Sequence, residues 1–287
     1  MKSNYRYIVK AFMAMAVIAG TTSCDDFLDR EPMSSISPET YYSTAAQLEA
    51  NLNDEYPNVL PSFGQWTYGI FGEDKGTDNQ IEVNANDRYT QDRWKVPHSE
   101  SDNWKFERIY RINFFLSEAL PKFGEDMIGS QNTISGSVAT IKHYIGEMYF
   151  LRAYEYFKKL QLFGDFPIIN QPLADEMEAL REASKRFPRN EVARFIISDL
   201  DKAYAYMSDV DMATTRINKD AAMLVKSRVA LFEATWLQNF KGTAFVPGGE
   251  GWPGASLHNN YQYPSGNIDN EVKYFLEQAV EASKLVA

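Results

Sequence analysis

Residues 137–167 read SVATIKHYIGEMYFLRAYEYFKKLQLFGDFP and hold the longest helical pattern of the chain. The apolar residues that set this pattern recur every three or four positions: Ile141, Ile145, Met148, Leu151, Tyr154 and Phe157. That spacing places them on one broad face of an α-helix. Gly164 and Pro167 end the pattern, because glycine suits the position after a helix and proline cannot continue one. The stretch predicts a long helix from about Ser137 to Phe163.

Five further segments repeat this period, and no strand pattern of comparable strength competes with them. They cover about residues 38–52, 102–120, 190–207, 218–236 and 269–283. Ser37, Asn190 and Asn218 are predicted N-caps, because their side-chain oxygens can accept from backbone N–H groups of the first turn. The apolar stripe of residues 222–236 is predicted to pack against the helix that ends at Phe163. The fold class predicted from these segments is mainly α.

Two long segments, about residues 57–97 and 241–267, lack a period and are rich in glycine and aromatic residues. Long irregular stretches inside a domain are usually functional. Sugar binding needs flat aromatic faces for the C–H side of a ring and fixed polar groups for its hydroxyls. The candidate ligand-binding residues are therefore Trp66, Tyr68, Asp78, Asn79, Tyr89 and Trp94 in the first segment, and Trp252 and Tyr261 in the second. We expect Trp66 and Trp94 to be at least partly exposed.

The charge balance excludes some partners. The formal net charge is −10, and without the three bases of residues 1–10 there remain 39 acidic residues against 26 basic ones, or −13. A surface this acidic repels phosphate backbones, so nucleic acid is not an expected partner. It also gives no attraction to anionic lipid, so membrane attachment has to be covalent.

The first residues match a secretory leader. Three bases precede an apolar run at residues 11–20. Ten helical residues span about 15 Å, half of a hydrocarbon core of about 30 Å, so a membrane-spanning helix is disfavoured. The run AGTTSC at residues 19–24 resembles the lipobox of bacterial lipoproteins, with Thr21 where leucine is commonest. This resemblance implies cleavage after residue 23 and acyl chains on Cys24, the single cysteine, followed by a tether over residues 24–37. Acyl chains alone give stable anchoring. The alternative is a conventional cut beside an ordinary cysteine.

Four stretches in order resemble landmarks of the SusD/RagB family of outer-membrane nutrient-binding lipoproteins. They are CDDFLDREP at residues 24–32, GEMYFLRAY at 146–154, LFGDFP at 162–167 and RINKDAA at 216–222. The resemblance implies a scaffold of tetratricopeptide-like helix pairs over residues 38–287. It also implies a lipid-anchored protein at the surface of the outer membrane, with a SusC-like TonB-dependent transporter and a glycan as partners. Family members are usually nearly twice as long, and the last helical pattern is still unfinished at Ala287. Both features predict a chain that lacks the C-terminal half of the family.

The function predicted by this resemblance is capture of an oligosaccharide and its delivery to the transporter. Peptide capture is the alternative within binding proteins, and a surface glycosidase is the alternative among enzymes. Glu73, Asp74 and Asp78 are the obvious paired carboxylates for a glycosidase, but dense acids on an acidic chain are typical of a solvated loop. The three histidines show neither metal-ligand spacing nor a nucleophile's partners: His98, His143 and His258. No catalytic residue, metal or cofactor is predicted, and the chain is not expected to be an enzyme.

Overall fold

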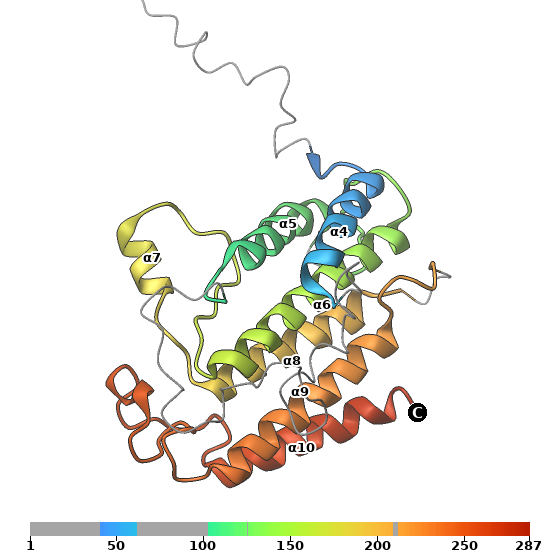
Figure 1. The fold of residues 1–287 in the computed structure, drawn as a ribbon. Helices are drawn as coiled ribbons and strands as arrows, with labels where there is room; N and C mark the ends of the chain where they lie inside the picture. Colours follow the sequence, from blue (N-terminus) through green and yellow to red (C-terminus); the bar gives the residue numbers. More distant parts are fainter. Residues whose placement is uncertain (1–40, 62–102, 125, 209–211) are drawn as a thin grey trace, which may run out of the picture. The chain divides into compact units, whose positions relative to one another are not determined.

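A computed structural model describes residues 41–61, 103–124, 126–208 and 212–287. Within these ranges the secondary structure is helical, with two isolated β-bridges and no strand. The helices are α4 (Ala45–Val59), α5 (Glu107–Phe123), α6 (Val138–Phe163), α7 (Met177–Ala183), α8 (Arg189–Tyr206), α9 (Lys219–Asn239) and α10 (Ile268–Lys284), with a short 3-10 helix at Pro253–Ser256. The mainly α prediction is confirmed (Figure 1).

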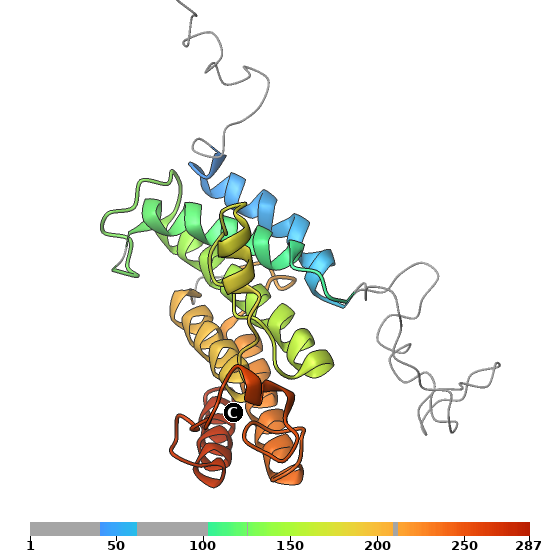
Figure 2. The ribbon, with the colours of Figure 1, turned by 90° about the vertical axis from the view of Figure 1, so that its left-hand side faces the viewer.

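Helix α6 forms the middle of the unit Tyr42–Ala287 and packs against α4, α5 and α8. Residues Ile141, Ile145 and Met148 are fully buried, as their spacing predicts. A Cβ on Gly146 would lie 2.8 Å from the Met207 backbone nitrogen, so glycine allows the end of α8 to approach α6 closely. Helix α9 then packs on α8, and α10 packs on α9, so that successive helices add to one scaffold (Figure 2).

Several predicted helix ends are confirmed by the structure. Helix α6 runs from Val138 to Phe163, and the Ser137 side chain accepts from the Thr140 backbone N–H. The Asn218 side chain caps α9 by accepting from Ala221 N at 2.8 Å.

Other predicted ends are wrong. Helix α8 begins at Arg189 with Pro188 as its N-cap, and Asn190 is fully buried inside the helix. The first predicted helix is interrupted at residues 42–44, where Thr44 caps α4 in a reciprocal pair with Gln47. Its predicted cap, Ser37, lies outside the described residues. Helix α4 also continues through Pro57 to Val59, into the segment predicted to be irregular.

The predicted packing of the 222–236 stripe is only partly correct. Ala222 and Val229 are fully buried, but α9 packs mainly on α8 and α10. Its contact with α6 includes an edge-to-face pair between Phe157 and Phe232, with ring centroids 5.6 Å apart. Helix α7 was not predicted. It has no buried residue and so carries no apolar periodicity to reveal it.

Candidate functional site

Most of the predicted ligand-binding residues lie outside the described part of the chain. These are Trp66, Tyr68, Asp78, Asn79, Tyr89 and Trp94, together with the carboxylates Glu73 and Asp74 and the lipid-attachment candidate Cys24. Their roles stay predictions. Trp252 and Tyr261 are described, and they locate the site that the structure offers.

Trp252 and Tyr261 fasten the 241–267 segment to the helices. The indole Nε1 of Trp252 donates to Asp165 Oδ2 at 2.7 Å, and 5% of the residue is exposed. The Tyr261 hydroxyl lies 2.9 Å from Asn190 Nδ2, and burial raises the pKa of this tyrosine. The two rings are 5.6 Å apart. Of the two residues, only Trp252 lines a groove.

The groove has a volume of about 880 Å³ and is built by four segments that are distant in the sequence. These segments are the end of α6 with its turn (161–165), the approach to α8 (184–189), Trp236 of α9, and residues 244–257. Leu162, Phe245 and Leu257 line it with 58%, 62% and 53% of their surfaces exposed. A large apolar surface is therefore open to a ligand here.

Asp165 holds two of these segments together. It accepts from the Arg189 backbone N–H at 2.9 Å and from the Trp252 indole. Burial raises the pKa of the Asp165 carboxyl, and the hydrogen bonds from Trp252 and Arg189 oppose that rise. Gly164 precedes it with a φ of +68°, a conformation that glycine adopts without strain. The Gly-Asp turn thus ends α6 and positions the start of α8 and the distant loop that carries Trp252.

A buried ion pair supports the α9 side of the groove. The Arg189 guanidinium donates three hydrogen bonds to Glu233, at 2.8 to 3.1 Å, and both residues are almost fully buried. Burial raises the pKa of Glu233, and the charge of Arg189 opposes it. The same guanidinium lies 4.1 Å from the centroid of the Trp236 ring, whose Nε1 donates to the Phe245 carbonyl at 3.0 Å. Trp236 and Phe245 are therefore held in place.

The groove offers binding contacts of two kinds, apolar surfaces and fixed polar groups, as sugar and peptide sites do. Among the lining residues that the structure describes, Asp165 is the one carboxylate. In the described ranges no group of three or more His, Cys, Asp or Glu residues is placed to hold a metal ion. His143 lies elsewhere: it is a buried residue of α6, and its Nε2 lies 3.0 Å from the Ile217 carbonyl oxygen.

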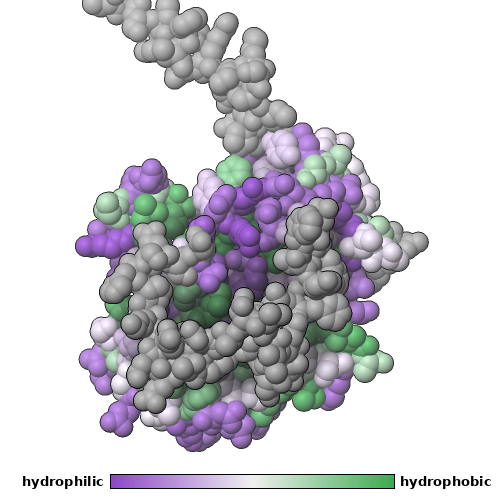
Figure 3. Space-filling view, in the orientation of Figure 1, coloured by the Kyte–Doolittle hydropathy of each residue, from purple (hydrophilic) through white to green (hydrophobic). Residues whose placement is uncertain are grey.

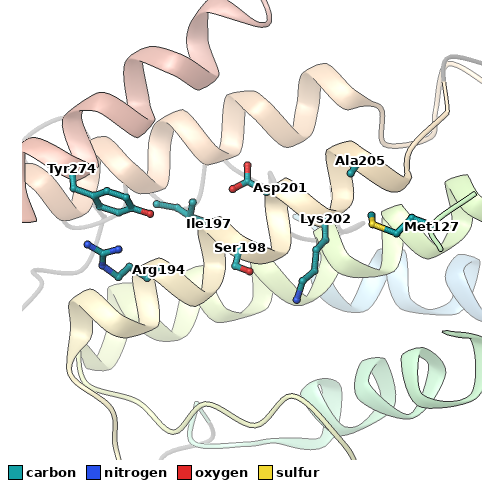
Figure 4. Close-up of a pocket in the computed structure, with 8 residues that line it drawn as sticks. All are labelled: Met127, Arg194, Ile197, Ser198, Asp201, Lys202, Ala205 and Tyr274. Atoms are coloured by element: carbon teal, nitrogen blue, oxygen red, sulfur yellow. The ribbon is translucent and has the colours of Figure 1, made fainter. Parts of the chain in front are cut away.

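A second depression lies along the outer side of α8, with a volume of about 340 Å³ (Figure 4). Its charged side chains already have partners. Arg194 donates to Glu271 at 2.7 and 2.8 Å, and Asp201 accepts from Lys226 at 2.7 Å. Lys202, the third charged lining residue, pairs with Asp199 at 3.9 Å.

Comparison with known proteins adds the family. A family model described as SusD-like, starch-binding and associating with the outer membrane matches residues 26–231. The chain belongs to this family. It is 26% identical to one SusD-like protein of Formosa agariphila over 75% of this chain and 41% of that protein. It is 25% identical to another from the same organism, over 84% of this chain and 46% of that protein.

The scaffold is the one found in SusD-like structures. A SusD-like protein of Bacteroides fragilis superposes with a TM-score of 0.51 over 74% of this chain and 39% of that one, at 21% identity. The tetratricopeptide-like helix-pair fold implied by the family resemblance is confirmed. The chain spans less than half the length of these three relatives. In the described ranges, no helix is both long and apolar enough to cross a bilayer.

Sequence reasoning missed most of the groove. Asp165 was part of a family landmark but had no assigned role, and Trp236 was assigned to the core. Arg186, Arg189 and Phe245 were not singled out. The landmark turn at residues 162–167 was the one signal that could have pointed to this place, because it forms one end of the groove.

Proposed function

We propose that this chain is a cell-surface lipoprotein, acylated on Cys24, that captures an oligosaccharide and delivers it to a SusC-like TonB-dependent transporter in the outer membrane. The observation that carries the proposal is the match of residues 26–231 to a family described as starch-binding and associating with the outer membrane. Residues 1–23 are then a leader that is removed, and residues 24–37 are a tether.

The groove at the end of α6 supports the binding half of the proposal. Phe245 presents an aromatic ring that is 62% exposed, beside the exposed leucines Leu162 and Leu257. Such surfaces cover the C–H face of a pyranose. Residues Trp66 to Trp94 stay predicted ligand-binding residues from the sequence.

Binding is tested by titrating the chain with maltooligosaccharides and other soluble neutral and acidic oligosaccharides, with peptides of similar length as the alternative ligand. We expect saturable binding of a glycan, with no new reducing ends after prolonged incubation. The Phe245→Ala variant should weaken binding, whereas Leu276→Ala, a change at an exposed residue of α10 outside the groove, should not. Binding of peptides alone, or release of reducing ends, would contradict glycan capture.

Anchoring and delivery need cells. Wild-type protein should partition into detergent and carry the mass of two or three acyl chains, and Cys24→Ala should lose both properties. Cross-linking on intact cells should join the wild-type chain to a TonB-dependent transporter. A wild-type mass without acyl chains would disprove the anchor, and a cross-link to no transporter would disprove delivery.

A further inference from the structure

Arg186 lies in the lining of the groove, and its guanidinium is available to bind a ligand. It is exposed and lines the groove, and in the described ranges its side chain makes no ion pair with a carboxylate. The other groove arginine, Arg189, is 3% exposed, and its Nε and Nη2 donate to the Glu233 carboxylate, which neutralises its charge. Arg186 is therefore the guanidinium of the groove that can still meet an anion.

The position of Arg186 is fixed before any ligand arrives. Its guanidinium lies 4.6 Å from the centroid of the Trp104 ring, and Trp104 in turn packs edge-to-face on Phe163. His258 Nε2 donates to the Arg186 carbonyl at 2.8 Å, which holds the backbone. A guanidinium over an aromatic face can still donate its N–H groups to a ligand. Because the planar side chain is already held in place, it loses little conformational entropy when a ligand binds.

The charges around Arg186 favour an anion locally. Lys185 lines the groove beside Arg186. Lys185 forms an exposed ion pair with Glu182, and separating such a pair costs little free energy. The nearby carboxyl of Asp165 is occupied by Trp252 and by the Arg189 backbone. The net charge of the whole chain, −10, opposes this local attraction because it repels anions. Any preference for an anionic ligand has to come from this site.

From this geometry we infer that the groove takes a carboxylated sugar, with the carboxylate of a uronic acid residue on Arg186 and a neighbouring ring against Phe245. This assignment rests on the proposed function and deepens it by naming the substrate class. A carboxylate receives two parallel N–H donors from one guanidinium, so the contact selects the planar anion over a hydroxymethyl group at the same ring position. The apolar wall contributes to binding of either sugar and does not discriminate between them.

The test uses oligogalacturonates and oligomannuronates, each paired with the same oligosaccharide after its carboxyl groups have been reduced to alcohols. The full chain should bind the carboxylated form about tenfold to a hundredfold more tightly than the reduced form. This preference should fall as salt concentration rises. Arg186→Gln should abolish the preference, and Arg186→Lys should restore part of it, because lysine keeps the charge but lacks the fork.

Two further variants separate the contributions. Arg181→Gln, which removes an exposed arginine of α7 outside the groove, should leave the preference unchanged. Phe245→Ala should lower the affinity for the carboxylated and the reduced oligosaccharide equally. Melting temperatures of all variants confirm that the exposed substitutions leave the fold intact.

The possible failures point to different errors. Equal affinity for carboxylated and reduced sugars would overturn the uronate assignment while leaving glycan capture in place. A preference that survives Arg186→Gln would overturn the role of this residue. Absence of binding to every glycan, neutral or acidic, would overturn both this inference and the proposed function.

Discussion

The buried ion pair between α6 and α8 permits a quantitative test of the scaffold. Arg152 donates from Nε and Nη2 to the two oxygens of Asp199, at 2.6 and 2.8 Å, and the residues are 3% and 0% exposed. Its Nη1 donates to Asn113 and to the Asn170 carbonyl, at 2.9 and 3.1 Å. Burial acts to lower the pKa of Arg152, but Asp199 more than compensates and leaves that pKa raised. The folded state therefore favours the charged pair.

The substitution Asp199→Asn keeps the shape of the side chain and removes its charge. It leaves the Arg152 guanidinium buried without a counter-charge, and such a loss costs about 3–5 kcal/mol. For a unit as large as residues 42–287, each kcal/mol lowers the melting temperature by about 2–4 °C. The expected decrease is therefore about 6–20 °C.

The measurement is thermal and urea unfolding of both proteins, with Glu178→Gln as the control. Glu178 pairs with Arg181 on α7 at 2.9 Å, and the two side chains are 74% and 71% exposed. An exposed pair contributes about 0.2–1 kcal/mol, so the control should melt close to the wild type. A decrease for Asp199→Asn no larger than that of the control would refute the reasoning that this pair holds α6 to α8.

Two further predictions concern the same scaffold. Gly146→Ala should lower the free energy of unfolding by about 1–2 kcal/mol in urea titrations, because the new Cβ would lie 2.8 and 2.9 Å from backbone atoms of Met207 and Ala203. This overpacking outweighs the gain in helix propensity. A stabilised variant would show that the helices can move apart freely. For Glu271, burial acts to raise the pKa, but hydrogen bonds from Arg194, Asn190 and Ser265 leave that pKa below its ordinary value of 4.5. Its carboxylate thus stabilises the fold fully above pH 4.5 and less as the pH falls through the lowered pKa. The difference in free energy of unfolding between wild type and Glu271→Gln should therefore shrink in acid. A difference independent of pH would contradict this.

Local signals predicted the middle of the fold well. Helix α6 was located to within a residue because its apolar period is continuous and because Ser137 and Gly164 lie directly beside its first and last residues. Asn190 was misassigned as a cap because the residue types that cap helices are also those that form buried hydrogen bonds. Its partners Tyr261 and Glu271 lie 71 and 81 residues further on, where no local pattern reveals them.

The candidate site was less predictable than the helices. Loop composition pointed correctly to the segment that carries Trp252, but it could not distinguish an aromatic ring that fastens the loop from one that faces a ligand. Phe245, which belongs to no periodic stripe, is the more exposed ring, and Trp252 is almost buried. Trp236 belongs to a helical stripe, so its period suggested core, although one part of it lines the groove.

The groove and the scaffold depend on the same few polar contacts. Asp165 joins the turn after α6 to Arg189 and to Trp252, and Arg189 joins α8 to Glu233 on α9. Arg186, three residues before Arg189, is placed by this arrangement and by its stacking on Trp104. The pair of Arg189 and Glu233 is almost fully buried, and buried polar contacts are strong enough to keep the segments of the groove in one geometry without a ligand. A preformed site loses less entropy on binding than one that must be ordered, which suits the proposed capture of an oligosaccharide.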